Sequence, residues 1–164
     1  MHMASKKVLG IYSTTCCEGC QVQLLNLGKD LLKLFDVYEL GNFSWAEDLP
    51  DPDHFDICLV EGSPITDEDR ELCVELRHKS DVIVAFGTCA HLGGVQEIRN
   101  YMENTKDQAK NYVYPMHNRV KVNAVLPVHK VIKVDYTIPT CPVVKEEVIK
   151  ILAGIDIKYR LIYI

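Results

Sequence analysis

The sequence predicts an α/β protein with a flavodoxin-like, doubly wound parallel sheet and helices on both of its faces. Short runs of apolar, β-branched residues recur along the chain and alternate with stretches whose apolar residues have helical spacing. Strands that alternate with helices are joined by crossover connections, and such connections produce parallel sheets. A chain of 164 residues with this pattern is expected to form a single domain over residues 1–164.

The first half of the chain supplies three of the expected strands and two helices. The strands are short, apolar runs at Lys7–Tyr12, Val37–Leu40 and Ile57–Val60. A helix is expected over Gln21–Phe35, because its leucines recur at helical spacing. A second helix is expected to begin after Thr66, which is a good N-cap residue followed by three acidic residues, and to end near Lys79.

The second half is less regular. Strands are expected at Asp81–Phe86 and Val131–Ile138, and a helix over Pro142–Leu152, because proline suits the first helical position. Residues 101–130 are polar and contain tyrosines and prolines, so we expect an irregular, partner-facing excursion. We expect residues 155–164 to form an edge strand, and residues 1–5 to be disordered or left over from expression.

Composition excludes several classes of protein. A net charge of −5 argues against a nucleic-acid binder, which needs clustered Lys and Arg for phosphate contacts. Apolar runs stay well below the ~20 residues of a membrane span, so no span is expected. The N-terminus lacks a signal peptide, which predicts a cytoplasmic protein. The seven cysteines are then expected to serve metal or redox chemistry rather than disulfides.

Four of the cysteines come shortly after expected strands. Cys17 and Cys20 follow the first strand, Cys89 follows Asp81–Phe86, and Cys141 follows Val131–Ile138. The carboxyl ends of parallel strands meet at one edge of the sheet, where ligands bind, so these thiols are expected to converge. Four thiolates suit an iron–sulfur cluster or a zinc ion.

The other cysteines are assigned by their surroundings. Cys16 is the neighbour of Cys17, so the sequence leaves open which of the two is the ligand. We assign Cys17 as the ligand and treat Cys16 as an adjacent cysteine that is not needed for binding. Cys58 and Cys73 are flanked by apolar residues and are expected to be core thiols. A redox pair of the CxxC type is an alternative for the first motif, but it leaves Cys89 and Cys141 without a role. Glu61, at a strand end, is expected to line the crevice or to bond the neighbouring turn.

Taken together, four motifs resemble the N-terminal domain of the [NiFe]-hydrogenase small subunit. They are Cys17-Glu-Gly-Cys20, Glu61-Gly62-Ser63, Gly87-Thr-Cys89-Ala and Thr140-Cys141-Pro142. The cluster-bearing subunit of respiratory complex I has a similar domain. The resemblance extends from the first expected strand to the last expected helix.

The resemblance implies an electron-transfer subunit of a hydrogenase, and so a subunit of an oxidoreductase that acts on hydrogen. One proximal [4Fe–4S] cluster would be held by Cys17, Cys20, Cys89 and Cys141. It would exchange electrons with a NiFe centre on a separate hydrogenase large subunit. No cysteine follows Cys141, so a further subunit or carrier is expected to accept the electrons.

Two other functions fit the same cysteines. A quinone-linked subunit of the complex I type is expected to use Cys16 and Cys17 as tandem ligands. A zinc-binding interaction module would use four thiolates equally well. Zinc ligands, however, usually come from two local cysteine turns, whereas these cysteines are distributed two, one and one along the chain.

Overall fold

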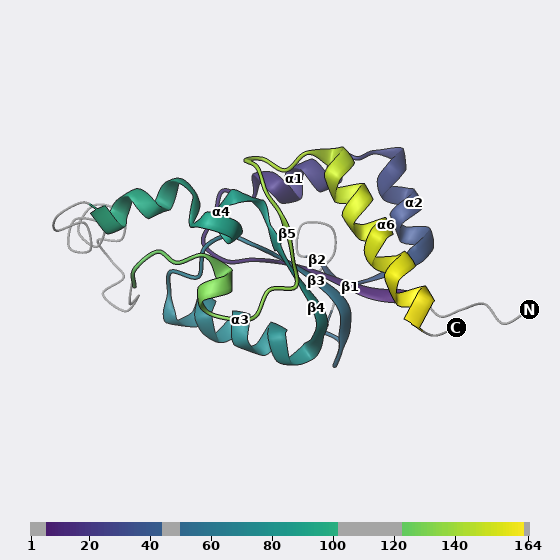
Figure 1. Ribbon diagram of the computed structural model, residues 1–164, viewed down its shortest axis with the longest axis horizontal. Helices are drawn as coiled ribbons and strands as arrows, with labels where there is room; N and C mark the ends of the chain where they lie inside the picture. Colours follow the sequence, from purple (N-terminus) through teal and green to yellow (C-terminus); the bar gives the residue numbers. More distant parts are fainter. Residues whose placement is uncertain (1–5, 44–49, 102–122, 163–164) are drawn as a thin grey trace, which may run out of the picture.

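The computed structural model describes residues 6–43, 50–101 and 123–162, and the side chains as far as residue 155. Within them lies a parallel sheet of five strands in the order β2-β1-β3-β4-β5 (Figure 1). The strands are β1 (Lys7–Ser13), β2 (Tyr38–Phe43), β3 (Phe55–Glu61), β4 (Ser80–Phe86) and β5 (Tyr136–Ile138). This is the strand order of flavodoxin-like folds, so the predicted fold class is confirmed.

Helices cover both faces of the sheet. Helices α1 (Gly19–Leu25), α2 (Lys29–Val37) and α6 (Lys145–Ile162) lie on one face, and α3 (Asp67–Lys79) lies on the other (Figure 1). Three shorter helical segments complete the described part of the chain: α4 (Gly87–Leu92), η1 (Gly94–Tyr101) and η2 (Val128–Lys130). In the described ranges, no helix has the length and apolar character needed to cross a bilayer.

The core has two halves because strand side chains alternate between the faces. On β3, Ile57 and Leu59 join the cluster beneath α1, α2 and α6, whereas Cys58 and Val60 join the cluster above α3. All four side chains are fully buried, as expected for a central strand of a parallel sheet. Cys73 on α3 is also buried, so the assignment of Cys58 and Cys73 to the core is confirmed.

The helix that begins after Thr66 was predicted correctly. Thr66 accepts a hydrogen bond from the backbone N–H of Asp69, and the Asp69 side chain accepts one from the backbone N–H of Thr66. This reciprocal pair is a capping box, which satisfies two N–H groups that a helix start otherwise leaves without partners.

Four local predictions were wrong. The expected helix over Gln21–Phe35 is two helices: α1 ends at Leu25, and Gly28, with a φ of +59°, is the N-cap residue of α2. Residues 155–162 of the expected edge strand over 155–164 form the end of α6, whose Val148, Leu152 and Ile155 pack on the sheet at helical spacing; residues 163–164 lie outside the described residues. The helix expected at Pro142 begins three residues later, and β5 is only Tyr136–Ile138.

Two predicted segments lie largely outside the described residues. Residues 1–5 are among them, as are residues 102–122 of the expected excursion. The described parts of that excursion are the end of η1 and a segment from residue 123 to η2 that contains no strand.

A half-buried carboxylate fastens β5 to the rest of the sheet. Asp135, just before β5, accepts the backbone N–H of Ile83 at 2.9 Å and the Arg77 guanidinium at 2.6 Å. Lys133 lies 3.1 Å from its other oxygen. Burial opposes ionisation of Asp135, but these hydrogen bonds outweigh it and hold its pKa below the usual value.

Replacing Asp135 with Asn is therefore expected to lower the free energy of unfolding at pH 7 by about 1–2 kcal/mol. Because the pKa of Asp135 is lower in the folded protein, the carboxylate stabilises the fold fully above its unfolded-state pKa of about 3.9. This stabilisation is lost as the pH falls through the folded-state pKa. Urea unfolding of both proteins from pH 7 to pH 3 should show the two stabilities converging in acid. The control is Asp30→Asn, which removes an exposed ion pair with Lys33 and should change stability by less than about 0.5 kcal/mol. A difference that stayed constant with pH would contradict this account of Asp135.

Candidate metal centre

The cysteine loops begin at one level of the sheet. Ser13, the last residue of β1, pairs with Glu61 of β3; Glu61 pairs with Phe86 of β4, and Phe86 pairs with Ile138 of β5. The four strand ends thus form one row across the sheet. The chain segments that leave this row carry all the cysteines predicted to bind a metal.

Each predicted ligand lies just beyond that row. Cys17 is in the loop after β1, Cys20 is in the first turn of α1, Cys89 is in α4, and Cys141 follows β5. Cys20 is buried, Cys89 is half-buried, and Cys17 and Cys141 are exposed. The candidate centre is therefore closed on the side of Cys20 and open to the surface on the side of Cys17 and Cys141.

The thiols lie close enough to influence one another electrostatically. Burial raises the pKa of Cys89, and negative charge on Cys141 and Cys17 raises it further. Burial and the charge of Glu61 raise the pKa of Cys20 to about 12, and negative charge on Cys89 adds to this effect. The structure therefore brings together the cysteines that the sequence placed after three separate strands.

Cys16 belongs to the same site. Its thiol is half-buried, and burial, Glu61 and negative charge on Cys89 are among the causes that raise its pKa to about 12. The neighbouring pair Cys16–Cys17 thus places two sulfurs near Cys89, and the sequence spacing alone does not choose between them.

Glycine at position 87 makes room for the Cys20 sulfur. Gly87 has a φ of +86°, and a Cβ atom there would overlap with Cys20 Sγ. The next residue, Thr88, donates its backbone N–H to the Thr140 carbonyl at 3.0 Å. This hydrogen bond joins the loop of Cys89 to the loop of Cys141, so both segments are held against Cys20.

Glu61 holds the first turn of α1 from the sheet side. Its carboxylate is almost fully buried and accepts the backbone N–H groups of Cys20 at 3.1 Å and Gln21 at 3.3 Å. The N-cap residue of α1, Glu18, makes no side-chain cap, so Glu61 replaces the acceptor that a capping side chain usually provides. Burial raises the pKa of Glu61, and these hydrogen bonds act in the opposite sense. Of the two expected roles, bonding the neighbouring turn is the one observed.

Gln96 is a polar contact that the sequence did not indicate. The Cys89 thiol donates to Gln96 Oε1 at 3.4 Å, and Gln96 Nε2 donates to the Thr15 carbonyl at 3.0 Å. The signals in the sequence are the glycines at 93 and 94, which let the chain turn back after Cys89.

The donor atoms of the candidate centre are soft thiolate sulfurs, which suit an iron–sulfur cluster or a zinc ion. Among the described residues, no three cysteine sulfurs lie within 4.8 Å of one another.

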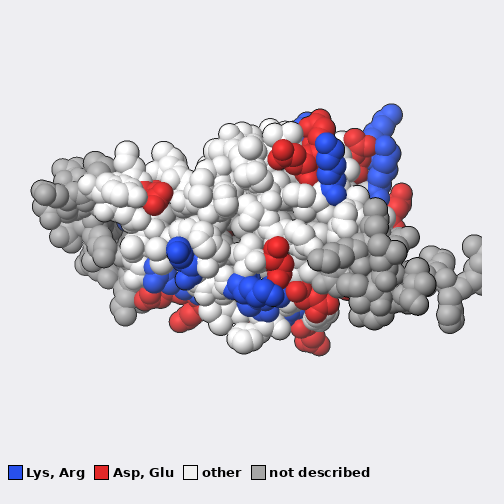
Figure 2. Space-filling model, in the orientation of Figure 1, with Lys and Arg blue, Asp and Glu red and all other residues white. Residues whose placement is uncertain are grey.

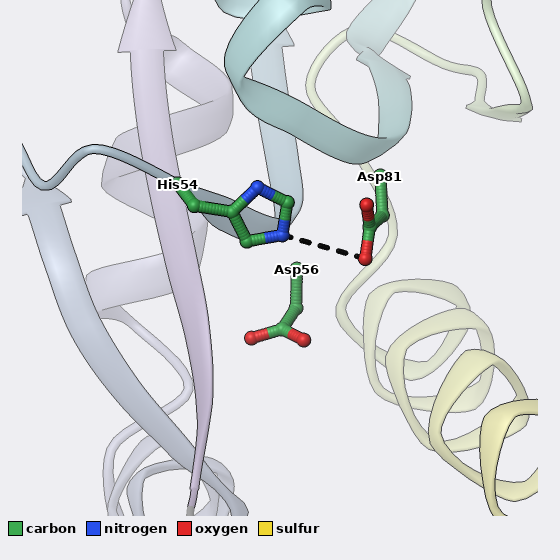
Figure 3. Close-up of side chains that lie close together, drawn as sticks. All are labelled: His54, Asp56 and Asp81. Atoms are coloured by element: carbon green, nitrogen blue, oxygen red, sulfur yellow. Dashed lines mark ion pairs between the residues drawn. The ribbon is translucent and has the colours of Figure 1, made fainter. Parts of the chain in front are cut away.

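A second group of potential metal ligands lies at the opposite edge of the sheet. The ligand atoms of His54, Asp56 and Asp81 lie within 4.8 Å of one another (Figure 3). His54 Nε2 faces Asp81 at 3.4 Å, and Asp56 accepts the backbone N–H of Val8 at 2.7 Å. These partners make the group a polar link between the starts of β1, β3 and β4. The sequence did not indicate it, because residues 56 and 81 become neighbours only through the pairing of β3 with β4.

Comparison with known proteins gives a consistent match. The family model described as "NADH ubiquinone oxidoreductase, 20 Kd subunit" matches residues 17–155. The chain is 36% identical to sulfhydrogenase 2 subunit delta of Pyrococcus furiosus over 60% of its own length and 40% of that relative. It is 31% identical to NAD-reducing hydrogenase HoxS subunit delta of Cupriavidus necator, over 59% of its own length and 46% of that relative. The chain therefore spans less than half the length of these curated relatives.

A solved structure shares the fold over nearly the whole chain. It is described as the crystal structure of an NAD⁺-reducing [NiFe]-hydrogenase in the H₂-reduced state. The match covers 92% of this chain and 93% of that one, with a TM-score of 0.77 and 24% identity. At this identity the likeness shows the fold.

We expect Gly87→Ala to disrupt the candidate centre. The added Cβ meets Cys20 Sγ, and the positive φ strains any L side chain, so the free energy of unfolding of the metal-free chain should fall by more than about 1 kcal/mol. Urea unfolding measures this loss. The matched control is Gly154→Ala on α6, where a Cβ meets nothing within 4 Å. This substitution should stabilise the helix by about 0.5–1 kcal/mol. Equal effects at the two glycines would show that position 87 has no special fit.

Proposed function

The chain belongs to the family of the 20 kDa subunit of NADH ubiquinone oxidoreductase, and we propose that it is the small, electron-transfer subunit of a [NiFe]-hydrogenase. In this proposal Cys17, Cys20, Cys89 and Cys141 hold one proximal [4Fe–4S] cluster. The cluster relays electrons between a NiFe site on a large subunit and a downstream acceptor. The observation that carries the proposal is the single row of strand ends from which the cysteine loops leave.

The relatives favour a hydrogenase within this family. Both curated relatives named above are hydrogenase subunits by name, and the matching solved structure is a [NiFe]-hydrogenase. One of these relatives and the solved structure are described as NAD-reducing, which supports an onward acceptor on a further subunit or carrier.

The chain's own residues would control the electron transfer. A bound [4Fe–4S] cluster accepts and donates one electron at a time, and its potential depends on burial and on hydrogen bonds to its sulfurs. Cys20 and Glu61 lie on the buried side of the site, whereas Cys17 and Cys141 face outward. Because of this asymmetry, a partner that covers the exposed side would lie a short electron-transfer distance from the cluster.

An apolar surface around the cysteines suits such a partner. Seven large apolar side chains are exposed on α1, α4, η1 and the segment before α6: Val22, Leu25, Leu92, Val95, Ile98, Tyr101 and Val144. Figure 2 shows few charged residues over α1 and α4, whereas charges gather over the ends of α2 and α6 and along α3. Exposed apolar patches of this kind mark protein interaction sites, so we assign the large subunit to this surface.

One observation favours a second candidate, the quinone-linked subunit of the complex I type. Cys16 is half-buried and lies within the electrostatic influence of Cys89. Its thiol is therefore available as a tandem ligand with Cys17, in place of Cys20.

Metal analysis tests the proposed function directly. We expect anaerobically purified protein to contain about four irons and four sulfides per chain and to give a reduced-cluster EPR signal after dithionite treatment. Cys89→Ser should fold but lose most of the iron and the signal. Cys73→Ala is the control, because that thiol lies in the core cluster above α3, and it should retain full iron. One zinc per chain with no sulfide would refute the cluster and support a zinc-binding module.

Two further cysteine variants separate the two family functions. If Cys20 is a ligand, Cys20→Ser should lose iron, sulfide and the EPR signal, whereas Cys16→Ser should retain them. The tandem-ligand alternative predicts the reverse. Iron and sulfide content and the EPR spectrum of both variants, prepared in parallel, decide between the alternatives.

A further inference from the structure

Gln96 connects one predicted ligand sulfur to the loop that carries another predicted ligand, Cys17. It lies in η1, seven residues after Cys89, and its side chain is half-buried. Its Oε1 accepts a hydrogen bond from the Cys89 thiol at 3.4 Å. Its Nε2 donates to the Thr15 carbonyl at 3.0 Å, two residues before Cys17. One carboxamide therefore spans the gap between the Cys89 segment and the loop after β1.

The backbone between Cys89 and Gln96 is shaped for this contact. Gly93 ends α4 and Gly94 follows it, with φ values of +92° and +65°. A Cβ atom on Gly94 would lie 2.7 Å from both Cys89 Sγ and Gln96 Oε1. The two glycines thus let the chain turn back, and the absence of a side chain at 94 lets the carboxamide reach the sulfur.

Metal binding changes what the Cys89 sulfur can bond. A cysteine that ligates a metal is a thiolate, so it has no proton to donate and can only accept hydrogen bonds. Gln96 Oε1, a hydrogen-bond acceptor, would then face a negatively charged acceptor. A half-turn of the carboxamide exchanges its oxygen and nitrogen, which are nearly equal in size. The turn places Nε2 against the sulfur.

The structure provides for the loss of the contact to Thr15. The Thr15 carbonyl also accepts the backbone N–H of Ser63 at 3.0 Å, so it retains a partner after Gln96 turns. Gln96 is half-buried, and water can therefore reach the displaced oxygen. The turned oxygen would face the Thr15 carbonyl, which is also an acceptor, so it must move from that carbonyl toward water. The exposed position of Thr15 and the half-buried position of Gln96 permit this movement, and neither group is then left without a hydrogen bond, which would cost about 1–3 kcal/mol.

We propose that Gln96 turns its carboxamide when the cluster binds and donates an N–H···S hydrogen bond to Cys89, which raises the reduction potential of the cluster. The proposal rests on the proposed function, because it requires Cys89 to be a cluster ligand. The direction follows from charge: a hydrogen-bond donor stabilises the thiolate most when the cluster carries the additional negative charge of the reduced state. The chemical partner of Gln96 is thus a metal-bound thiolate.

The test compares the cluster-loaded chain with two variants and one control. Gln96→Leu keeps the approximate size but removes both hydrogen-bonding atoms, and Gln96→Glu keeps the acceptors but removes the donor. Cys73→Ala is the control, because it changes a thiol in the core cluster above α3. EPR-monitored redox titration should give a lower midpoint potential for both Gln96 variants, with Glu lowest because of its charge, and an unchanged potential for Cys73→Ala. ENDOR spectra should lose one exchangeable-proton coupling in both Gln96 variants, relative to wild type and Cys73→Ala.

The outcomes separate this inference from the proposed function. A wild-type chain without iron and sulfide would overturn the proposed function and this inference with it. A wild type with a full cluster, and variants with unchanged potential and proton coupling, would overturn the role of Gln96 alone. If Gln96→Leu does not fold, the Gln96→Glu titration decides: a potential no lower than that of wild type refutes the donated hydrogen bond.

Discussion

The hydrogen bonds of Glu61 are the constraint on which the cysteine site depends. Its backbone pairs with both neighbouring strands, and its carbonyl accepts the N–H of Thr14 at 2.8 Å, which starts the loop toward Cys17. Its carboxylate accepts the N–H groups of Cys20 and Gln21. A buried carboxylate is costly unless it is hydrogen-bonded, and here the donors are the N–H groups at the start of α1. The same contacts that satisfy the carboxylate therefore fix the position of Cys20.

The surroundings of the site disfavour free thiolates when no metal is bound. Burial and Glu61 raise the pKa values of Cys16 and Cys20 to about 12, so at neutral pH these thiols keep their protons in the metal-free chain. Thiolates become favourable when a positively charged metal group replaces those protons. Metal binding by these cysteines would therefore release protons, and the fold already holds the sulfurs near each other without a metal.

Glycines and exposed apolar side chains give this edge of the sheet free space beside the sulfurs and an apolar surface. Gly87 and Gly94 leave space beside the sulfurs of Cys20 and Cys89, respectively. Exposed residues such as Leu92 and Val95 lie on the segments that follow Cys89. The opposite edge contains the polar group of His54, Asp56 and Asp81, so the two edges of the sheet have different chemistry.

Much of the fold and the outline of the site were predictable from the sequence. Apolar β-branched runs predicted the strands, Thr66 predicted its helix start, and the cysteine positions after the strands predicted one common edge. The single helix over Gln21–Phe35 failed because helical spacing continues through Gly28, although the backbone turns there. The strand at 155–164 failed because an apolar tail fits a strand or a helix equally well until its packing surface is known.

The sequence by itself determined the strand runs, the fold class and the placement of the cysteine motifs after strands, because these depend on local composition and spacing. Only the tertiary structure decided that Glu61 caps α1 across 41 positions of sequence and that Gln96 bridges Cys89 and Thr15. It also decided that Cys16 shares the site. Such contacts depend on strand register, burial and the direction of individual side chains, and no local pattern of residues encodes these.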